Sequence, residues 1–339
     1  MTSSTENFPA QKSALNVVMG AMTFGEAGTD GARVSQLKDI EAILDVFLKH
    51  GHREVDTARV YCRGTSEEYL GKIDWQGKGI SMETKLYPVK GYSITGTHSP
   101  EDLRKFLMVS LKALNTDKLE MWYLHGPDRS VPYEDTLKAV NDLYKEGYFK
   151  RFGISNYMSW EVAEIVGICK RNGYIQPTAY QGIYNAIHRA VEPELFPCLR
   201  KFGISFYEFN PLAGGFFTGR YNSADDQAES GSRFDPNGQQ GKSYRARYWK
   251  EAYFGALKSI GIVAEKHNLT MAEIALRWIS HHSLMRREHG DAVLIGASSL
   301  NHVEQNLIDL EKGPLPEEVL KALDAAWLSV KSDATPYYH

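Results

Sequence analysis

The sequence has few of the features that mark secreted, membrane-bound or nucleic-acid-binding proteins. Its three cysteines, Cys62, Cys169 and Cys198, are odd in number and form no CxxC pair, which argues against a disulfide framework and is typical of a reducing compartment. No stretch approaches the ~18 apolar residues of a membrane span, and the N-terminus lacks the apolar core of a signal peptide. The net charge of -3 gives no electrostatic reason to bind nucleic acid or an anionic membrane. We therefore expect a cytoplasmic protein with neither partner.

Further absences concern domain organisation and metals. No shift in composition marks a domain boundary, so we expect a single domain over 15–339 after a loose polar segment over 1–14. The histidines His281, His282 and His289 have no second cluster with ligand spacing, so we expect no metal site. No G-x-G-x-x-G motif follows the first predicted strand, which argues against a doubly wound dinucleotide-binding sheet.

What the chain does contain is a regular alternation of short apolar segments with amphipathic ones. The apolar segments predict strands, and the amphipathic segments between them predict helices. Strict alternation of this kind predicts a parallel sheet with right-handed crossovers, and eight strands predict a closed (β/α)8 TIM barrel. The predicted strands cover about 17–24, 53–56, 80–85, 119–124, 149–154, 177–181, 204–209 and 292–295.

Four details of this barrel are expected from local residues. The opening stretch 17–24 is interpreted as a short strand or hairpin, which supplies the first strand or an N-terminal cap. A helix over 191–201 should be broken by Pro197. The polar stretch 221–247 is far longer than a typical loop, and its place after the seventh strand predicts a functional loop on the active face. An extra helix is expected near the C-terminus, over 316–330.

Catalytic residues of such barrels lie where strands end, at the C-terminal face. The second predicted strand ends at Asp56, with Tyr61 just beyond it, the third ends at Lys85, and His125 follows the fourth. Each alone fits an ordinary surface or loop role. Together they form a proton-donating set: an ammonium lowers the pKa of a neighbouring phenol, a carboxylate orients the lysine, and a histidine can hydrogen-bond the same substrate oxygen. Such a site protonates a carbonyl oxygen while hydride reaches the carbon.

With these residues in this order, the chain resembles the aldo-keto reductase superfamily, and within it the aflatoxin B1 aldehyde reductase family. The resemblance implies NADPH-dependent reduction of aldehydes, including dialdehydes, semialdehydes and aromatic aldehydes, and of some ketones. It implies that Tyr61 is the general acid, that Lys85 and Asp56 tune it, and that His125 positions the carbonyl of the substrate. The matching motifs include Asp56-Thr57-Ala58-x-x-Tyr61, Glu83-Thr84-Lys85, Leu124-His125-x-Pro127, Gly153-Ile154-Ser155-Asn156, Tyr180-Gln181-Gly182-x-Tyr184-Asn185-Ala186 and Asn210-Pro211-Leu212-Ala213-Gly214-Gly215.

The same resemblance implies an NADPH site along the strand ends. The nicotinamide end would contact Asp56, Ser155, Asn156, Gln181 and Phe209, and Phe209 stands where many relatives carry a stacking tyrosine. The pyrophosphate would be held by backbone N–H groups in the segment that contains Asn210, Pro211, Leu212, Gly214, Gly215 and Arg220. The adenosine end would contact Arg233, Gly296, Ser298, Ser299, His302, Gln305 and Asn306. Ser298 and Ser299 precede a predicted helix, whose free N–H groups suit a 2′-phosphate, whereas His302 replaces the glutamine usual in relatives.

Several alternatives stay open at this level. A redox-sensing regulatory subunit that resembles the potassium-channel β subunits would share the fold, the cofactor and the complete tetrad. Close relatives that reduce succinic semialdehyde end in an arginine, whereas this chain ends in Tyr337-Tyr338-His339, and histidine is a weaker, pH-dependent partner for a carboxylate. The physiological small-molecule carbonyl substrate is therefore open. So is the oligomeric state, although the resemblance is compatible with a homodimer.

Overall fold

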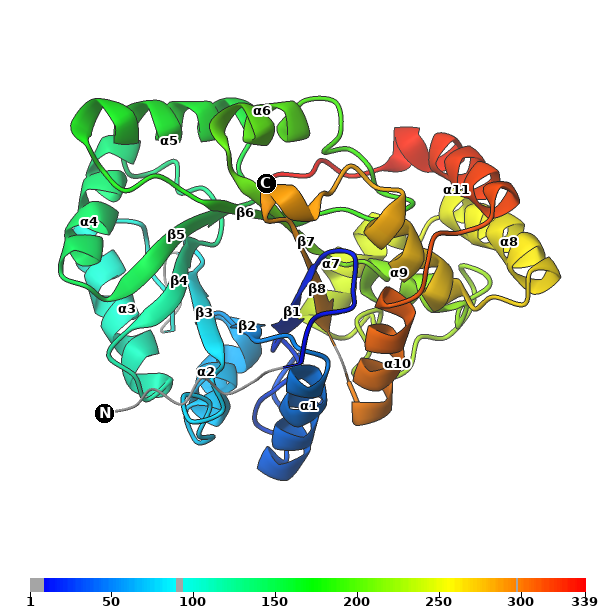
Figure 1. The fold of residues 1–339 in the computed structure, drawn as a ribbon, viewed down its shortest axis with the longest axis horizontal. Coiled ribbons are helices and arrows are strands. Elements are labelled where there is room, and N and C mark those ends of the chain that lie inside the picture. The colour runs from blue at the N-terminus through cyan, green and yellow to red at the C-terminus, as the bar shows by residue number, and fades with distance from the viewer. Residues whose placement is uncertain (1–8, 90–93, 297) are drawn as a thin grey trace.

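The barrel is visible directly in the computed structural model, which describes residues 9–89, 94–296 and 298–339. Eight parallel strands follow one another around a closed barrel, with β8 pairing back onto β1, and the helices lie outside it (Figure 1). The predicted (β/α)8 TIM barrel is thus confirmed. The strands are β1 (Asn16–Gly20), β2 (Glu54–Asp56), β3 (Ser81–Leu86), β4 (Leu119–Leu124), β5 (Phe149–Ser155), β6 (Ala179–Ile183), β7 (Ser205–Phe209) and β8 (Ala292–Gly296).

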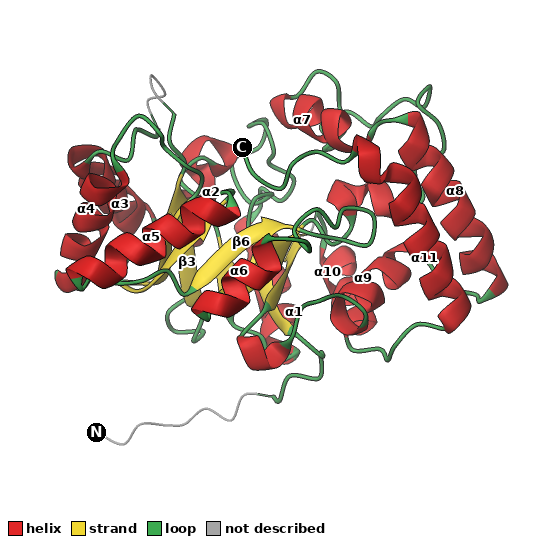
Figure 2. Ribbon diagram, turned by 90° about the horizontal axis from the view of Figure 1, so that it is seen from above, coloured by secondary structure: helices red, strands yellow, loops and turns green. Residues whose placement is uncertain are grey.

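Helices α3, α9 and α10 begin at residues whose side chains cap the helix. Ser99 accepts a hydrogen bond from the Asp102 amide at the start of α3, and Pro100 occupies the first helical position, where a missing N–H does no harm. Helices α8 and α11 pack against each other at one side of the barrel (Figures 1 and 2). The helices are α1 (Leu37–Lys49), α2 (Thr65–Leu70), α3 (Pro100–Ala113), α4 (Tyr133–Lys145), α5 (Ser159–Asn172), α6 (Leu195–Phe202), α7 (Gln239–Tyr248), α8 (Glu251–Lys266), α9 (Met271–His281), α10 (Leu300–Leu310) and α11 (Glu317–Val330).

The structure decides between two alternatives for the opening stretch and corrects the expectation about Pro197. The opening stretch is the first strand of the barrel and not a hairpin or cap, because β1 pairs in parallel with β2 and β8 and ends at Gly20. Helix α6 starts only at Leu195, so Pro197 lies in its first turn, where no intrahelical N–H bond is lost and the helix is not broken.

The two segments expected to be irregular are partly ordered. The long segment after β7 contains helix α7, which Figure 2 shows at the same end of the molecule as the C-terminus. Of the segment expected to be loose, residues 1–8 lie outside the described residues. Just after them, the Arg287 guanidinium donates hydrogen bonds to the Gln11 side chain and to the Ser13 carbonyl.

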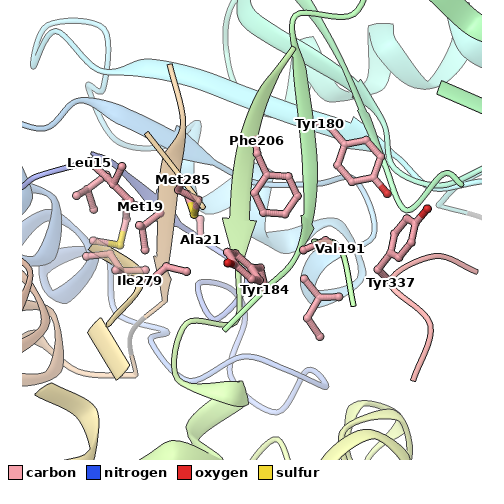
Figure 3. Packing of buried hydrophobic residues seen from close by; sticks show 14 of the residues in the cluster. Leu15, Met19, Ala21, Tyr180, Tyr184, Val191, Phe206, Ile279, Met285 and Tyr337 are labelled. Carbon is pink, nitrogen blue, oxygen red and sulfur yellow. The ribbon is translucent and has the colours of Figure 1, made fainter. Parts of the chain in front are cut away.

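The apolar core lies mainly between the strands and the surrounding helices. On β7, Phe206 points outward and packs beside Tyr180 and Tyr184, with ring centroids 6.1 and 6.0 Å away (Figure 3). The next residue, Tyr207, points inward, because side chains alternate along a strand, and belongs to a small cluster inside the barrel. The outer layer therefore supplies most of the hydrophobic burial, which leaves the interior of the barrel free to hold polar side chains.

Glu208 is an exception to the apolar character of the outer layer. It follows Tyr207 and so points outward like Phe206, it is fully buried, and neither of its carboxyl oxygens has a hydrogen-bond partner among the described residues. Burial raises the pKa of Glu208 well above its ordinary value, so the folded protein favours the neutral carboxyl.

We predict that Glu208→Gln makes protein stability less dependent on pH. In the unfolded chain, Glu208 ionises above about pH 4.3, whereas the folded state keeps its proton to a higher pH, so wild-type stability is lost as pH rises through that window. The variant lacks this loss, and its free energy of unfolding should exceed that of the wild type at pH 8 by on the order of 1–3 kcal/mol. Urea unfolding at pH 5 and pH 8 measures the difference, and equal pH dependence in the two proteins would contradict it.

Candidate active site

The four residues of the predicted tetrad meet at the C-terminal end of the barrel. Lys85, near the end of β3, donates from Nζ to Asp56 Oδ2 at 2.6 Å, to the Thr57 carbonyl at 2.8 Å and to the Tyr61 hydroxyl at 3.4 Å. His125 follows β4, and its ring meets the Tyr61 ring edge-on with the centroids 5.6 Å apart. Side chains from three different strand exits thus converge on one phenol.

The electrostatics of this group keep Lys85 charged. Burial alone would lower the pKa of Lys85, but the charge of Asp56 and the nearby Tyr61 phenol outweigh it, so that the pKa lies above its ordinary value. For Asp56, burial raises the pKa, while the charge and hydrogen bond of Lys85 and a 3.0 Å hydrogen bond from Gln181 Nε2 lower it. We take the close contact as an ion pair, because an isolated buried charge on either partner would be much less stable.

Tyr61 and His125 are both neutral near pH 7. Burial raises the pKa of the Tyr61 phenol, and Lys85 opposes this only in part. The expectation that Lys85 brings the pKa of Tyr61 below its ordinary value is therefore not met, because burial is the larger effect. Burial and the positive charge of Lys85 lower the pKa of His125 well below its ordinary value. A protonated phenol thus faces a neutral imidazole, which can hydrogen-bond an oxygen without competing for charge.

A strained turn holds Tyr61 in place. The next three residues, Cys62, Arg63 and Gly64, all have positive φ angles, of 47°, 54° and 95°, and two of them are not glycine, which costs of order 1–3 kcal/mol each. A buried ion pair at 2.6 Å between Arg59 and Glu67 braces the turn. Sequence reasoning missed this brace, although a glycine three residues after the tyrosine was a signal for unusual backbone.

The residues predicted to bind the nicotinamide lie around the tetrad, and several of them form hydrogen bonds with one another or with the tetrad. Asn156 donates from its side chain to the His125 carbonyl at 2.8 Å and to the Ser155 hydroxyl at 2.9 Å. Gln181 donates to Asp56. Phe209, at the end of β7, is half-buried and packs against the cluster inside the barrel. The structure therefore brings this group together at the barrel mouth.

The segment after β7 has the character of an anion cradle. Gly214 and Gly215 have φ angles of 69° and 97°, and a Cβ on Gly214 would lie 2.3 Å from the ring of Tyr244. The Asn210 side chain accepts a hydrogen bond from the Tyr244 hydroxyl at 3.0 Å, while its buried Nδ2 has no acceptor within the part of the chain that the structure describes. A buried donor without a partner fits a site that receives one from a ligand. Tyr244 was not singled out from the sequence.

The residues predicted for the adenosine end are only partly assembled. Arg233 lies beside the end of β8, since a Cβ on Gly296 would be 3.4 Å from its guanidinium, and no described carboxylate pairs with it. Ser299 caps helix α10 and Ser298 contacts His302, with the hydroxyl 3.0 Å from Nδ1. The other residues predicted for the cofactor contact protein groups or are buried. Gln305 donates a hydrogen bond to Asp309, Arg220 forms an ion pair with Glu229 at the surface, and Asn306 is buried in α10.

Aromatic rings that the sequence did not single out form the rim of the site. Tyr87 lies 5.4 Å from His125 and 5.9 Å from His339, centroid to centroid. The C-terminal residues reach the mouth because the His339 amide donates to the Asn156 carbonyl at 3.3 Å. Tyr337 anchors this segment next to Tyr180 (Figure 3), where its hydroxyl accepts a hydrogen bond from the Ser159 amide and donates one to Glu194. The last residues of the chain therefore belong to the site.

A TIM barrel that holds a buried lysine–aspartate pair beside a protonated tyrosine has the fold and site of an oxidoreductase. The chain belongs to the aldo/keto reductase family, whose model matches residues 16–328. It is 46% identical over 336 residues to the aldo-keto reductase pigE of Monascus ruber, covering 97% of this chain and 98% of that protein. It is 43% identical to human aldo-keto reductase family 7 member A3, covering 95% and 96%, and 42% identical to mouse aflatoxin B1 aldehyde reductase member 2, covering 95% and 87%.

Aldo-keto reductases are oxidoreductases that generally use nicotinamide cofactors. Three features fit such a group: the buried Asn210 amide, the adjacent glycines Gly214 and Gly215, and Arg233, which has no carboxylate partner among the residues that the structure describes. Within the described residues, none of the helices has the length and apolar character needed to cross a membrane.

We predict that Gly64→Ala disrupts the turn that carries Tyr61. A Cβ at this position would lie 1.5 Å from Arg59 Nη2, and alanine disfavours a φ of 95°. Gly147→Ala is a matched control, because Gly147 has a φ of 90° but nothing within 4 Å of a Cβ. The control should lose about 1–2 kcal/mol, and Gly64→Ala should lose about 3 kcal/mol or more, because it also leaves buried Glu67 without its arginine. Urea unfolding compares the two, and equal losses would contradict the role of Arg59.

Proposed function

We propose that this protein reduces aldehydes to alcohols with NADPH, and that Tyr61 protonates the carbonyl oxygen. The observation that carries the proposal is the position of the protonated phenol, between the charged Lys85 and the neutral His125. The printed names of several relatives, including mouse and human aflatoxin B1 aldehyde reductases, support aldehydes as the substrate class.

Each side chain of the tetrad has a distinct role in the proposed reduction. Tyr61 donates its proton to the carbonyl oxygen as negative charge develops there, and the Lys85 ammonium stabilises the resulting phenolate. Asp56 keeps Lys85 charged and oriented. Neutral His125 hydrogen-bonds the same oxygen and sets its direction. When bound, a nicotinamide cofactor supplies the hydride. Ser155, Asn156 and Gln181 would hold its carboxamide, and Phe209 would stack on its ring.

Arg233 supports NADPH over NADH. It is a guanidinium without a carboxylate partner among the described residues, and it lies beside the end of β8, the strand that precedes α10 in the chain. A guanidinium and a helix N-terminus are both well suited to a phosphate group. The 2′-phosphate is what distinguishes the two cofactors, so this pairing would set the preference.

The rim of the site bears on the substrate. The ring of His125 contacts Tyr61, and Tyr87 in turn contacts both His125 and His339. The guanidinium of Arg129, which contacts the His339 carbonyl, is already paired with Glu161. Such a rim suits aromatic and uncharged aldehydes, including dialdehydes. It offers a weaker partner to semialdehydes that carry a carboxylate.

We predict that Tyr61→Phe lowers kcat/KM for 4-nitrobenzaldehyde by about 10²–10⁴-fold, because it removes the general acid and keeps the ring. Cofactor affinity, measured by quenching of protein fluorescence with NADPH, should stay close to that of the wild type. Turnover at the wild-type rate would refute the assignment of Tyr61. Slow wild-type turnover with retained cofactor would instead favour the redox-sensing alternative.

We predict that Arg233→Gln weakens NADPH binding by about 10–100-fold and leaves NADH binding unchanged, since hydrogen bonds to charged groups contribute about 1.5–3 kcal/mol. Arg220→Gln is the informative comparison. Arg220 is proposed to contact the pyrophosphate, which both cofactors share, so any effect there should be equal for NADPH and NADH. Fluorescence titrations measure all four affinities. An Arg233→Gln variant that weakens both cofactors alike would contradict a 2′-phosphate contact.

A further inference from the structure

The interior of this barrel is unusually acidic below the tetrad. Barrel interiors of this type are mostly filled by branched apolar side chains. Here, Glu54 stands two residues before Asp56 on β2, and Glu83 stands two residues before Lys85 on β3. Side chains two apart point to the same side of a strand, so all four face the interior. Asp56 and Glu83 are also partners in the strand register. Glu83 therefore lies beside Asp56 across the sheet, and Glu54 lies one inward-facing position closer to the N-terminal end of the barrel.

Hydrogen bonds connect these acids to the floor of the barrel. Glu83 is fully buried, and its Oε2 accepts a hydrogen bond from the Tyr123 hydroxyl at 3.1 Å. Glu54 Oε2 accepts one from the Tyr207 hydroxyl at 3.0 Å, and Tyr207 accepts one from Arg151 at 3.2 Å. Glu54 begins β2, and both it and Arg151 are only partly buried. Glu54 and Glu83 also contact each other through their carboxyl groups, and Glu83 is the register partner of Asp56, so a column of polar groups extends from the partly exposed Glu54 to the tetrad.

The charges in the column imply one shared proton. Three carboxyl groups, those of Glu54, Asp56 and Glu83, face two cations in the resting site, Lys85 and Arg151. Burial, reinforced by Glu54 and Asp56, raises the pKa of Glu83 well above its ordinary value, which favours a protonated Glu83 carboxyl. Glu83 Oε1 has no donor among the described residues, which fits an oxygen that carries a proton itself. The groups that face Glu83 are Glu54, Asp56, Lys85, Tyr123, Arg151 and Tyr207.

We propose that Glu54 and Glu83 conduct a proton from solvent at the floor of the barrel to the Asp56–Lys85 pair, so that Tyr61 is reprotonated from the side opposite the substrate. The inference rests on the proposed function, because it concerns the proton that each carbonyl reduction consumes. On this path the proton does not pass through the mouth of the barrel, where substrate and cofactor would bind.

The steps balance with one proton for each turnover. The O–H bond of Tyr61 breaks as an O–H bond forms on the substrate oxygen. The phenolate then takes a proton from the Lys85 ammonium, and the neutral amine regains one from Glu83 by way of Asp56. The Glu83 carboxylate takes a proton from Glu54, which takes it from water. The hydride comes from the cofactor, and no other oxidant or reductant is needed.

Stopped-flow measurements on Glu83→Gln test the path. Gln keeps the shape of the side chain and an oxygen for Tyr123, but it cannot relay a proton. NADPH absorbance reports hydride transfer, and a pH-indicator dye reports proton uptake. In the first turnover, hydride transfer should stay within about twofold of the wild type, because Tyr61 starts protonated, whereas proton uptake should slow by about tenfold or more. Glu54→Gln should act in the same direction.

Glu208→Gln is the matched control. Glu208 is as fully buried as Glu83, but it points away from the barrel interior, so both rates should equal those of the wild type. Infrared spectra without cofactor add a second measurement: Glu83→Gln should remove a protonated-carboxyl band.

Wild-type proton uptake in Glu83→Gln would overturn the path, and so would an equal slowing of both rates, which would indicate a structural role. If Glu83→Gln does not fold, the same measurements on Glu54→Gln, at a partly exposed position, test the path. If the wild type transfers no hydride to aldehydes, the proposed function fails, and an unchanged infrared band in Glu83→Gln would still refute the stored proton.

Discussion

The buried ion pair between Lys85 and Asp56 is the constraint on which the site depends. Two charges removed from water are stable only when they are close together and their remaining hydrogen-bonding groups are satisfied. An ammonium has three donors, and Lys85 has three acceptors: Asp56, the Thr57 carbonyl and the Tyr61 hydroxyl. Because the third acceptor is the phenol oxygen, the phenol's own proton points elsewhere, away from the lysine. The hydrogen bond from Lys85 to the phenol oxygen of Tyr61 thus directs the catalytic proton of Tyr61 toward the barrel mouth.

The fold explains why these groups can be held so firmly. Asp56 and Lys85 belong to adjacent strands of a closed sheet, whose register is fixed by backbone hydrogen bonds. Tyr61 lies outside the sheet, and a strained turn braced by the Arg59–Glu67 pair fixes its position. Strain of this kind persists only where the surroundings over-determine it. The rigid pair and the strained turn therefore act together, since a relaxed turn would withdraw the third acceptor of Lys85.

Much of the fold and of the tetrad could be predicted from the sequence, because the spacing of apolar residues and the position of polar residues at strand ends are local signals. Alternating apolar segments predicted the barrel, and the barrel placed Asp56, Lys85 and His125 at strand ends. The failures depended on contacts between distant segments. The effect of Pro197 depended on where α6 starts, which the preceding turn sets. The choice between a barrel strand and a hairpin for the opening stretch depended on the pairing of β1 with β8. The pKa of Tyr61 depended on how completely the barrel buries it, and Tyr87 and Tyr244 carried no sequence motif.

The acids in the barrel interior follow from the same constraint. A charged Glu83 next to Asp56 would add to the field that holds Lys85 protonated, but the two carboxylates would repel each other in a place with little water. A proton on Glu83 removes that repulsion and leaves Asp56 as the single anion beside the lysine. Glu54 is partly exposed and accepts a hydrogen bond from Tyr207, which itself accepts one from Arg151. The buried pair at the mouth thus favours a neutral acid beside it, and a neutral acid between a lysine and solvent is a group able to pass a proton on.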